Sequence, residues 1–191
     1  ISNNRLYQTA TRTQTTGAQH SGIRISNTSG NAFSVTGNTI GFATSAGTGP
    51  YTFVGGSSSS TFVPINLSVG STTATSVQGN TIAGIAMSGA LSGTSSSGSF
   101  RGIYVGSGLT TIGDVSGNTI GSQSATGSIT WTSSSTSAGD VMGMFNFGSS
   151  NWTVQNNTVG GITASNSSTG AANVYGIRLN TSSTAVTNIS N

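Results

Sequence analysis

Short segments in which apolar and polar residues alternate recur along the chain. In the clearest of them two apolar residues flank one polar position, as Ile23 and Ile25 flank Arg24. A period of two residues predicts β-strands with one buried face, and no segment shows the 3.6-residue period of a helix. We therefore expect an all-β protein. The segments read "GIRI" at 22–25, "PINL" at 64–67, "GIYV" at 102–105 and "GIRL" at 176–179.

A second motif follows each of these segments at a nearly constant distance. "VTGNTIG" at 35–41 returns as "VQGNTIAG" at 77–84, "VSGNTIG" at 115–121 and "VQNNTVGG" at 154–161, and the chain opens on "ISNNRL". Four repeats have the same spacing of ten residues between the two apolar positions: Ile25 to Val35, Leu67 to Val77, Val105 to Val115 and Leu179 to Ile189. Internal repetition of this kind is typical of a solenoid.

A repeat of roughly 38 residues with three short strands cannot bury its own apolar face, but stacked copies bury a continuous core. We expect a parallel β-helix of about five such coils, with loops of variable length rich in Ser and Gly. Residues 1–191 are expected to form a single domain that is a fragment of a longer repetitive chain, because both ends fall inside a repeat.

The asparagine of the second motif is expected at a corner of every coil, where the backbone bends between two sheets. Stacked amides can hydrogen-bond to one another along the axis, as in an asparagine ladder. The Ile or Val two residues later should point inward, and the intervening threonines 39, 81, 119 and 158 should form an outward column. The predicted ladder consists of Asn4, Asn38, Asn80, Asn118 and Asn157.

The segments "GIRLNTSSTAVTNISN" and "VSGNTIG" resemble the repeats of right-handed parallel β-helix proteins, the pectate-lyase-like superfold. The padding with Ser, Thr and Gly resembles long repetitive surface proteins secreted by Bacteroidota-type bacteria. The resemblance covers essentially the whole chain and implies a right-handed coil. It implies much less about function, because this fold carries lyases, hydrolases, adhesins and tailspikes.

Composition excludes several functions. Charged residues make up 4% of the chain, with five arginines and two aspartates. Five scattered arginines do not form the basic stripe that nucleic-acid binding requires. No apolar stretch approaches the roughly 18 residues of a membrane span, so neither nucleic acid nor membrane is an expected partner. The many hydroxyls and few charges suit an extracellular, secreted protein at a cell surface.

Candidate chemistry is sparse. Asp114 and Asp140 fall on different segments and lack the partners of a carboxylate-based enzyme, so we expect no catalysis, no metal site and no cofactor. Asp140 is predicted to form a surface ion pair with Arg101, and Asp114 to precede Val115 on a strand. His20, the one histidine, is predicted to be a turn residue. Trp131 and Trp152 are expected to be buried.

The outward position of the first segment gives a candidate contact face, since Arg and Tyr are enriched at binding surfaces. In the fourth repeat two registers are possible: one follows the ten-residue spacing, and the other is shifted by two residues to restore the glycine. The face comprises Arg24, Asn66, Tyr104 and Arg178, with Gly143 or Phe145 from the fourth repeat according to register.

Three functions fit these patterns. The first is a structural or adhesive module of an extracellular bacterial rod or filament, which stacks end to end with further coils or subunits of the same protein. The second is a β-helix that binds or degrades carbohydrate, with surface glycans as partners. The third is ice binding through the threonine column.

Overall fold

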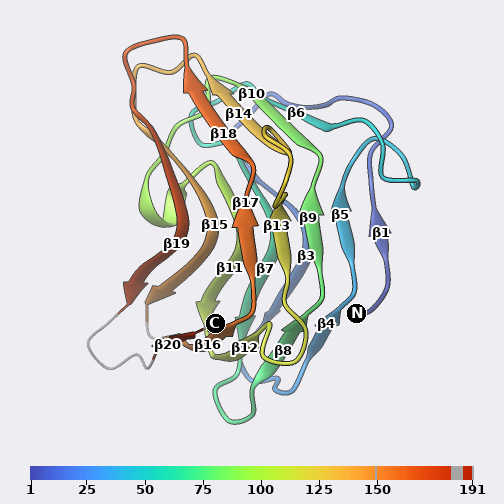
Figure 1. The fold of residues 1–191 in the computed structure, drawn as a ribbon. Helices are drawn as coiled ribbons and strands as arrows, with labels where there is room; N and C mark the ends of the chain where they lie inside the picture. The colour runs from blue at the N-terminus through green and yellow to red at the C-terminus, as the bar shows by residue number, and fades with distance from the viewer. Residues whose placement is uncertain (149, 182–186, 191) are drawn as a thin grey trace.

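The computed structural model describes residues 1–148, 150–181 and 187–190, with no side-chain description for residue 181. The chain forms four parallel sheets of five strands each, and successive strands of every sheet come from successive repeats. In Figure 1 the strands of the first sheet lie side by side in chain order from β1 to β17. The only helix in the described residues is one short 3₁₀ turn, η1 (Ser95–Ser97).

Four strands recur in every repeat, so each sheet can be named by its first strand. Sheet 1 contains β1 (Arg5–Leu6), β5 (Thr39–Gly41), β9 (Thr81–Ala83), β13 (Thr119–Gly121) and β17 (Thr158–Gly160). Sheet 2 contains β2 (Arg12–Gln14), β6 (Tyr51–Gly55), β10 (Ile85–Gly89), β14 (Ile129–Ser133) and β18 (Ile162–Asn166). Sheet 3 contains β3 (Gln19–Asn27), β7 (Thr61–Val69), β11 (Phe100–Ser107), β15 (Gly139–Gly148) and β19 (Ala172–Thr181). Sheet 4 contains β4 (Ser34–Thr36), β8 (Thr75–Gln78), β12 (Leu109–Ile112), β16 (Asn151–Gln155) and β20 (Thr187–Ser190).

The prediction of an all-β fold with stacked parallel strands is confirmed, and the arrangement is compatible with a β-solenoid. The prediction of three strands per repeat was wrong, because the second motif forms two strands rather than one. β4 ends at Thr36 and β5 begins at Thr39, with Gly37 and Asn38 at the corner between them. Gly37 adopts a left-handed conformation with φ 64°, which turns the chain from sheet 4 into sheet 1.

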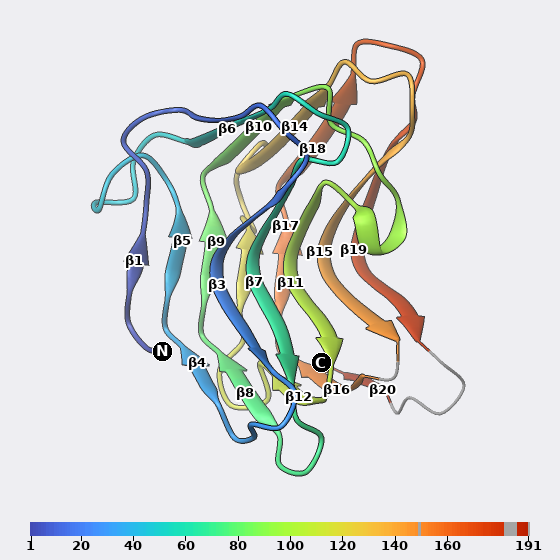
Figure 2. The same cartoon turned by 180° about the vertical axis from the view of Figure 1, so that it is seen from behind.

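The core runs through the space enclosed by the sheets and is built from rows of equivalent residues. Ile23, Ile65, Ile103 and Met144 form one such row, and all four side chains are buried. Trp131 and Trp152 are also buried, as predicted. Figure 2, seen from behind, shows the strands of sheet 3 in order from β3 to β19. The apolar alternation read from the sequence is therefore the inward face of continuous sheets.

One prediction based on the ten-residue spacing was wrong. The residue that pairs with Val77 is Ile112, whereas Val115 is 84% exposed in the loop after β12. Asp114 lies in the same loop and not on a strand. A single residue, Gly108 with φ 100°, connects β11 to β12, so the third repeat reaches sheet 4 early. The connection that follows, between β12 and β13, is correspondingly longer.

The structure also decides between the two registers of the fourth repeat. Ile103 pairs with Met144 and Tyr104 with Phe145, so the shifted register is correct and Phe145 occupies the outward position. The glycines of the first segment consequently align. A Cβ on Gly102 would lie 2.5 Å from the carbonyl oxygen of Gly143, so glycine is needed where sheet 3 bends against its neighbours.

In the described residues there is no helix long and apolar enough to cross a membrane.

Candidate functional site

The five asparagines form one hydrogen-bonded column along the molecule. Asn38 donates from its backbone N–H and from its side-chain Nδ2 to Oδ1 of Asn80, at 3.0 and 2.9 Å. The same two bonds join Asn80 to Asn118, at 2.9 and 2.8 Å. They recur from Asn4 to Asn38 and from Asn118 to Asn157. The spacing of the motif therefore corresponds to direct contacts between successive repeats.

From Asn38 onward, each ladder amide also binds the repeat before its own. Nδ2 of Asn80 donates to the carbonyl oxygen of Val35 at 2.8 Å, and Nδ2 of Asn118 donates to that of Val77 at 2.9 Å. One asparagine thus links three consecutive repeats. In every bond between two ladder asparagines the donor belongs to the earlier repeat and the acceptor to the later one, so the ladder has a direction.

The predicted inward and outward positions beside the ladder are also as expected. Ile40, Ile82 and Ile120 are buried, and Thr39, Thr81 and Thr119 pair in one partly exposed row of sheet 1. Leu6 and Val159, at the two ends of the row, pack against the core while remaining partly exposed.

The predicted contact face is one column of sheet 3, but it is not an exposed stripe. Arg24, Asn66, Tyr104, Phe145 and Arg178 pair in that order. Arg24 is exposed, Asn66 and Phe145 are buried, and Tyr104 and Arg178 are intermediate. The rings of Tyr104 and Phe145 stack with centroids 5.6 Å apart. A ligand could reach parts of this column but not its whole length.

Two arginines pack on tyrosines of their own strands. The guanidinium carbon of Arg101 lies 4.7 Å from the centre of the Tyr104 ring, and that of Arg178 lies 4.7 Å from the Tyr175 ring. Both pairs are three residues apart, across the glycine bend of sheet 3. Such cation–π contacts are favourable, and more so when desolvated. Burial raises the pKa of the Tyr104 hydroxyl, an effect that the positive charge of Arg101 partly offsets.

The predicted surface ion pair between Asp140 and Arg101 was wrong in both partner and position. Asp140 is 1% exposed and pairs with Arg178 of the next strand. Its carboxylate also accepts from the backbone N–H of Ser95 at 2.7 Å and from Nδ2 of Asn173 at 2.9 Å. The shifted register places Met142, not Asp140, beside Arg101.

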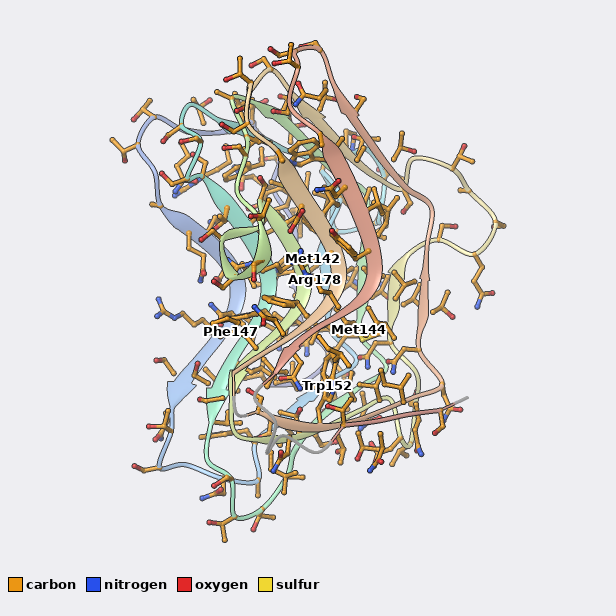
Figure 3. The ribbon with its side chains drawn as sticks, turned by 90° about the vertical axis from the view of Figure 1, so that its left-hand side faces the viewer. Met142, Met144, Phe147, Trp152 and Arg178 are labelled. Carbon is orange, nitrogen blue, oxygen red and sulfur yellow. The ribbon has the colours of Figure 1, made fainter. Side chains whose placement is uncertain are left out.

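The Asp140 cluster lies on the outer side of sheet 3, under the connection that carries η1. In Figure 3 Phe147 lies on the opposite side of the β15 ribbon from Met144 and Trp152. A Cβ on Gly98 would lie 2.3 Å from the Met142 side chain, so the connection packs closely on β15. This connection spans residues 90–99, whereas four or five residues join sheets 2 and 3 in the other repeats.

Arg101 is buried without a carboxylate. It is 4% exposed, and burial lowers the pKa of its guanidinium, an effect that nearby Tyr104 opposes. It donates to the carbonyl oxygen of Ser96 and, at 3.4 Å, to Oε1 of Gln19. Its Nε is buried and has no hydrogen-bond partner in the part of the chain that the structure describes.

The other carboxylate, Asp114, accepts a hydrogen bond from Nε2 of Gln78. The same glutamine accepts at its Oε1 from the backbone N–H groups of Val115 and Ser116, at 3.2 and 3.1 Å. Gln78 thereby fixes the loop after β12. Among the residues described, no three His, Cys, Asp or Glu side chains gather into a set that could hold a metal ion.

His20 lies in β3 and not in a turn, contrary to the prediction. Its Nε2 is 2.5 Å from the hydroxyl of Tyr51, and its ring lies 5.0 Å from that of Phe62. Burial, with a smaller contribution from the positive charge of Arg12, lowers the pKa of His20. The inward position in register with Phe62 accounts for this environment.

The C-terminal end face exposes residues that belong to buried rows. Val174, Ile177, Leu179 and Ile189 are 38–49% exposed, although Val141, Met144 and Val154 of the same rows are at most 2% exposed. A hollow of about 410 Å³ opens there between Val154, Asn157, Ile177 and Ile189.

Comparison with known proteins identifies no relative of the chain. No family model matches the chain, and no curated protein or solved structure is significantly similar to it.

The sequence indicated the ladder and the order of the outward column. It did not indicate the buried Arg101, the partner of Asp140 or the packing of η1 on sheet 3. The one available signal was the length of the connection 90–99.

Proposed function

We propose that the chain is a non-catalytic structural module of an extracellular bacterial rod or filament, whose end faces are covered by further rungs of the same repeat. A rung is one strand of each sheet. In this proposal the fold is a right-handed parallel β-helix of the pectate-lyase-like superfold, similar to repetitive surface proteins of Bacteroidota-type bacteria.

The observation that carries the proposal is the exposure of core rows at the C-terminal end face. Ile177, Leu179 and Ile189 continue rows whose earlier members are buried. An exposed apolar patch of this kind marks an interaction site. Parallel strands also leave unpaired backbone groups at the edge of each sheet, which another strand can pair with.

The N-terminal end face carries the opposite end of the ladder and the first members of the same rows. The rows that end on Ile177, Leu179 and Ile189 begin on Ile23, Ile25 and Val35. The ladder begins on Oδ1 of Asn4, an acceptor, and ends on the backbone N–H of Asn157, a donor. A rung stacked head to tail would therefore join a ladder donor to a ladder acceptor. The exposed apolar residues of the contact would come mainly from the C-terminal end face, because Ile23 and Val35 are themselves buried.

The test is the association state of residues 1–191 over a range of concentrations, measured by sedimentation velocity. Here the covering rung is supplied by a second copy. We expect head-to-tail oligomers that Ile177→Asp with Leu179→Asp abolishes. Val115→Asp, which alters an exposed valine far from the end rows, should leave association unchanged. A chain that stays monomeric at every concentration, or equal effects of the two sets of variants, would contradict the proposal.

A further inference from the structure

A pocket of about 400 Å³ lies where the connections from sheet 2 to sheet 3 of the second and third repeats face each other. Its walls are rich in hydroxyl groups, and its volume is in the range of small-molecule sites. No carboxylate occurs among the described residues that line it. The main contributors are Ser58, Ser59, Ser92, Ser96, Ser97 and Arg101.

Arg101 brings a positive charge to this pocket that the protein does not neutralise. The sequence has only two acidic side chains. Asp140 pairs with Arg178, and Asp114 is bound by Gln78 in the loop after β12. A buried charge that lacks a counter-charge is costly, so a cation in this position calls for an anionic partner.

The hydrogen bonds of Arg101 use only two of its five N–H donors. Its terminal nitrogens donate to Ser96 and Gln19, whereas its buried Nε–H has no partner among the residues described. Tyr104 lies against the guanidinium plane. Arg101 is thus held in place by groups that carry no negative charge, while N–H donors of its charged guanidinium are still to be satisfied.

We propose that this pocket binds an oxyanion, a carboxylate, sulfate or phosphate group, through Arg101 and the surrounding serine hydroxyls. Arginine binds oxyanions through strong charge-assisted hydrogen bonds, and hydroxyls add neutral donors. Because the pocket is larger than a single ion needs, the oxyanion can belong to a small polar molecule such as a uronic acid. This site is independent of the end faces, and it requires no stacking.

The test is an NMR titration of ¹⁵N-labelled residues 1–191, in which the Nε–Hε resonance of Arg101 is followed. Sodium sulfate, phosphate, acetate and glucuronate are added separately, with sodium chloride as the ionic-strength control. Concentrations up to ~50 mM nearly saturate a site with a millimolar dissociation constant. Comparison of acetate with glucuronate shows whether the sugar ring contributes beyond the carboxylate.

We expect a saturable shift of the Arg101 resonance with at least one oxyanion and no comparable shift with chloride. Arg24→Gln, which removes an exposed arginine of the same sheet, should leave binding unchanged. Arg101→Gln should abolish saturable shifts of the backbone amides of Ser96 and Ser97. Ser97→Ala, at the pocket wall, should weaken binding several-fold and gives a second variant if Arg101→Gln does not fold.

The wild-type titration decides the question without any variant. No saturable shift with any of the four anions would overturn the proposal and leave Arg101 with a purely structural role against Ser96 and Tyr104. Equal shifts with chloride, or with Arg101→Gln, would do the same, because they reflect ionic strength rather than a site.

Discussion

Oδ1 of Asn118 accepts two hydrogen bonds from Asn80, one from its backbone N–H and one from its side-chain amide. Asn80 in turn accepts two from Asn38 and donates to the carbonyl oxygen of Val35. One buried side chain therefore satisfies polar groups of three repeats. The cost of removing it is dominated by the groups left without partners.

Asn80→Ala should lower the free energy of unfolding by about 3 kcal/mol, because several buried donors and acceptors lose their partners together. Asn4→Ala removes the exposed end of the ladder and should cost less than about 1 kcal/mol. Urea unfolding of both variants measures the difference. Equal losses would show that the ladder adds nothing beyond the local turn.

Gly143 and Gly176 occupy equivalent positions in sheet 3, but only the first is enclosed. A Cβ on Gly143 would lie 2.4 Å from Val159 and 2.6 Å from the carbonyl oxygen of Gly176, whereas one on Gly176 would meet nothing within 4 Å. Gly143→Ala should destabilise the fold by roughly 3 kcal/mol, and Gly176→Ala by less than about 0.5 kcal/mol. Thermal unfolding of the two variants measures this difference in stability.

Gly176→Ala also tests the proposed stacking without weakening the fold. A further rung would bring a strand against residue 176, as Gly176 itself lies against residue 143, and the added methyl group would clash with it. We expect this variant to be folded but monomeric in sedimentation velocity. Undiminished association would show that no strand packs there.

The pair formed by Asp140 and Arg178 predicts an asymmetry. Asp140 is 1% exposed and Arg178 is 25% exposed, so only the arginine can recover hydration when its partner is lost. Arg178→Gln leaves a buried carboxylate without its cation and should cost about 3 kcal/mol. Asp140→Asn should cost about 1 kcal/mol, because the new amide oxygen still accepts hydrogen bonds. Chemical denaturation of the two variants gives the comparison, and a larger loss for Asp140→Asn would refute this account.

Stability should depend on pH through His20. Its pKa in the folded protein is lowered from the ordinary value of 6.5, so the folded state favours the neutral ring. The contribution is fully present above pH 6.5, and it is lost as pH falls below that value and the unfolded chain takes up the proton first. The slope cannot exceed about 1.4 kcal/mol per pH unit, the limit for one proton.

Unfolding free energies between pH 7.5 and 5 measure this effect. His20 is the one histidine and the chain has only two acidic side chains, so the interval reports mainly on His20. His20→Phe should remove the pH dependence, and Arg24→Gln should preserve it. A pH dependence that survives in His20→Phe would assign it to another group.

Much of the fold could be predicted because residues at equivalent positions of successive repeats lie next to one another when the repeats stack. Alternation around Ile23 and Ile25 gave the buried face of β3, and the recurring asparagine gave the ladder. Both depend on local pattern and on the parallel pairing of like residues, which hold wherever repeats stack.

The failures came where the repeats differ in length. Equal spacing pointed to Val115 as the partner of Val77, yet Ile112 takes that place because Gly108 shortens the path between β11 and β12. In the fourth repeat the glycine, and not the spacing, identified the register that brings Phe145 beside Tyr104.

By itself, then, the sequence determined most of the residues that face the core and which asparagines meet, since both follow from the pairing of like residues in successive repeats. Only the tertiary structure decided how the long connection 90–99 folds back onto sheet 3. That contact joins Ser95 to Asp140 and Ser96 to Arg101. It buries groups whose positions in the repeat would otherwise face solvent, because the longer connection folds back over its own strand and over the strand of the next repeat.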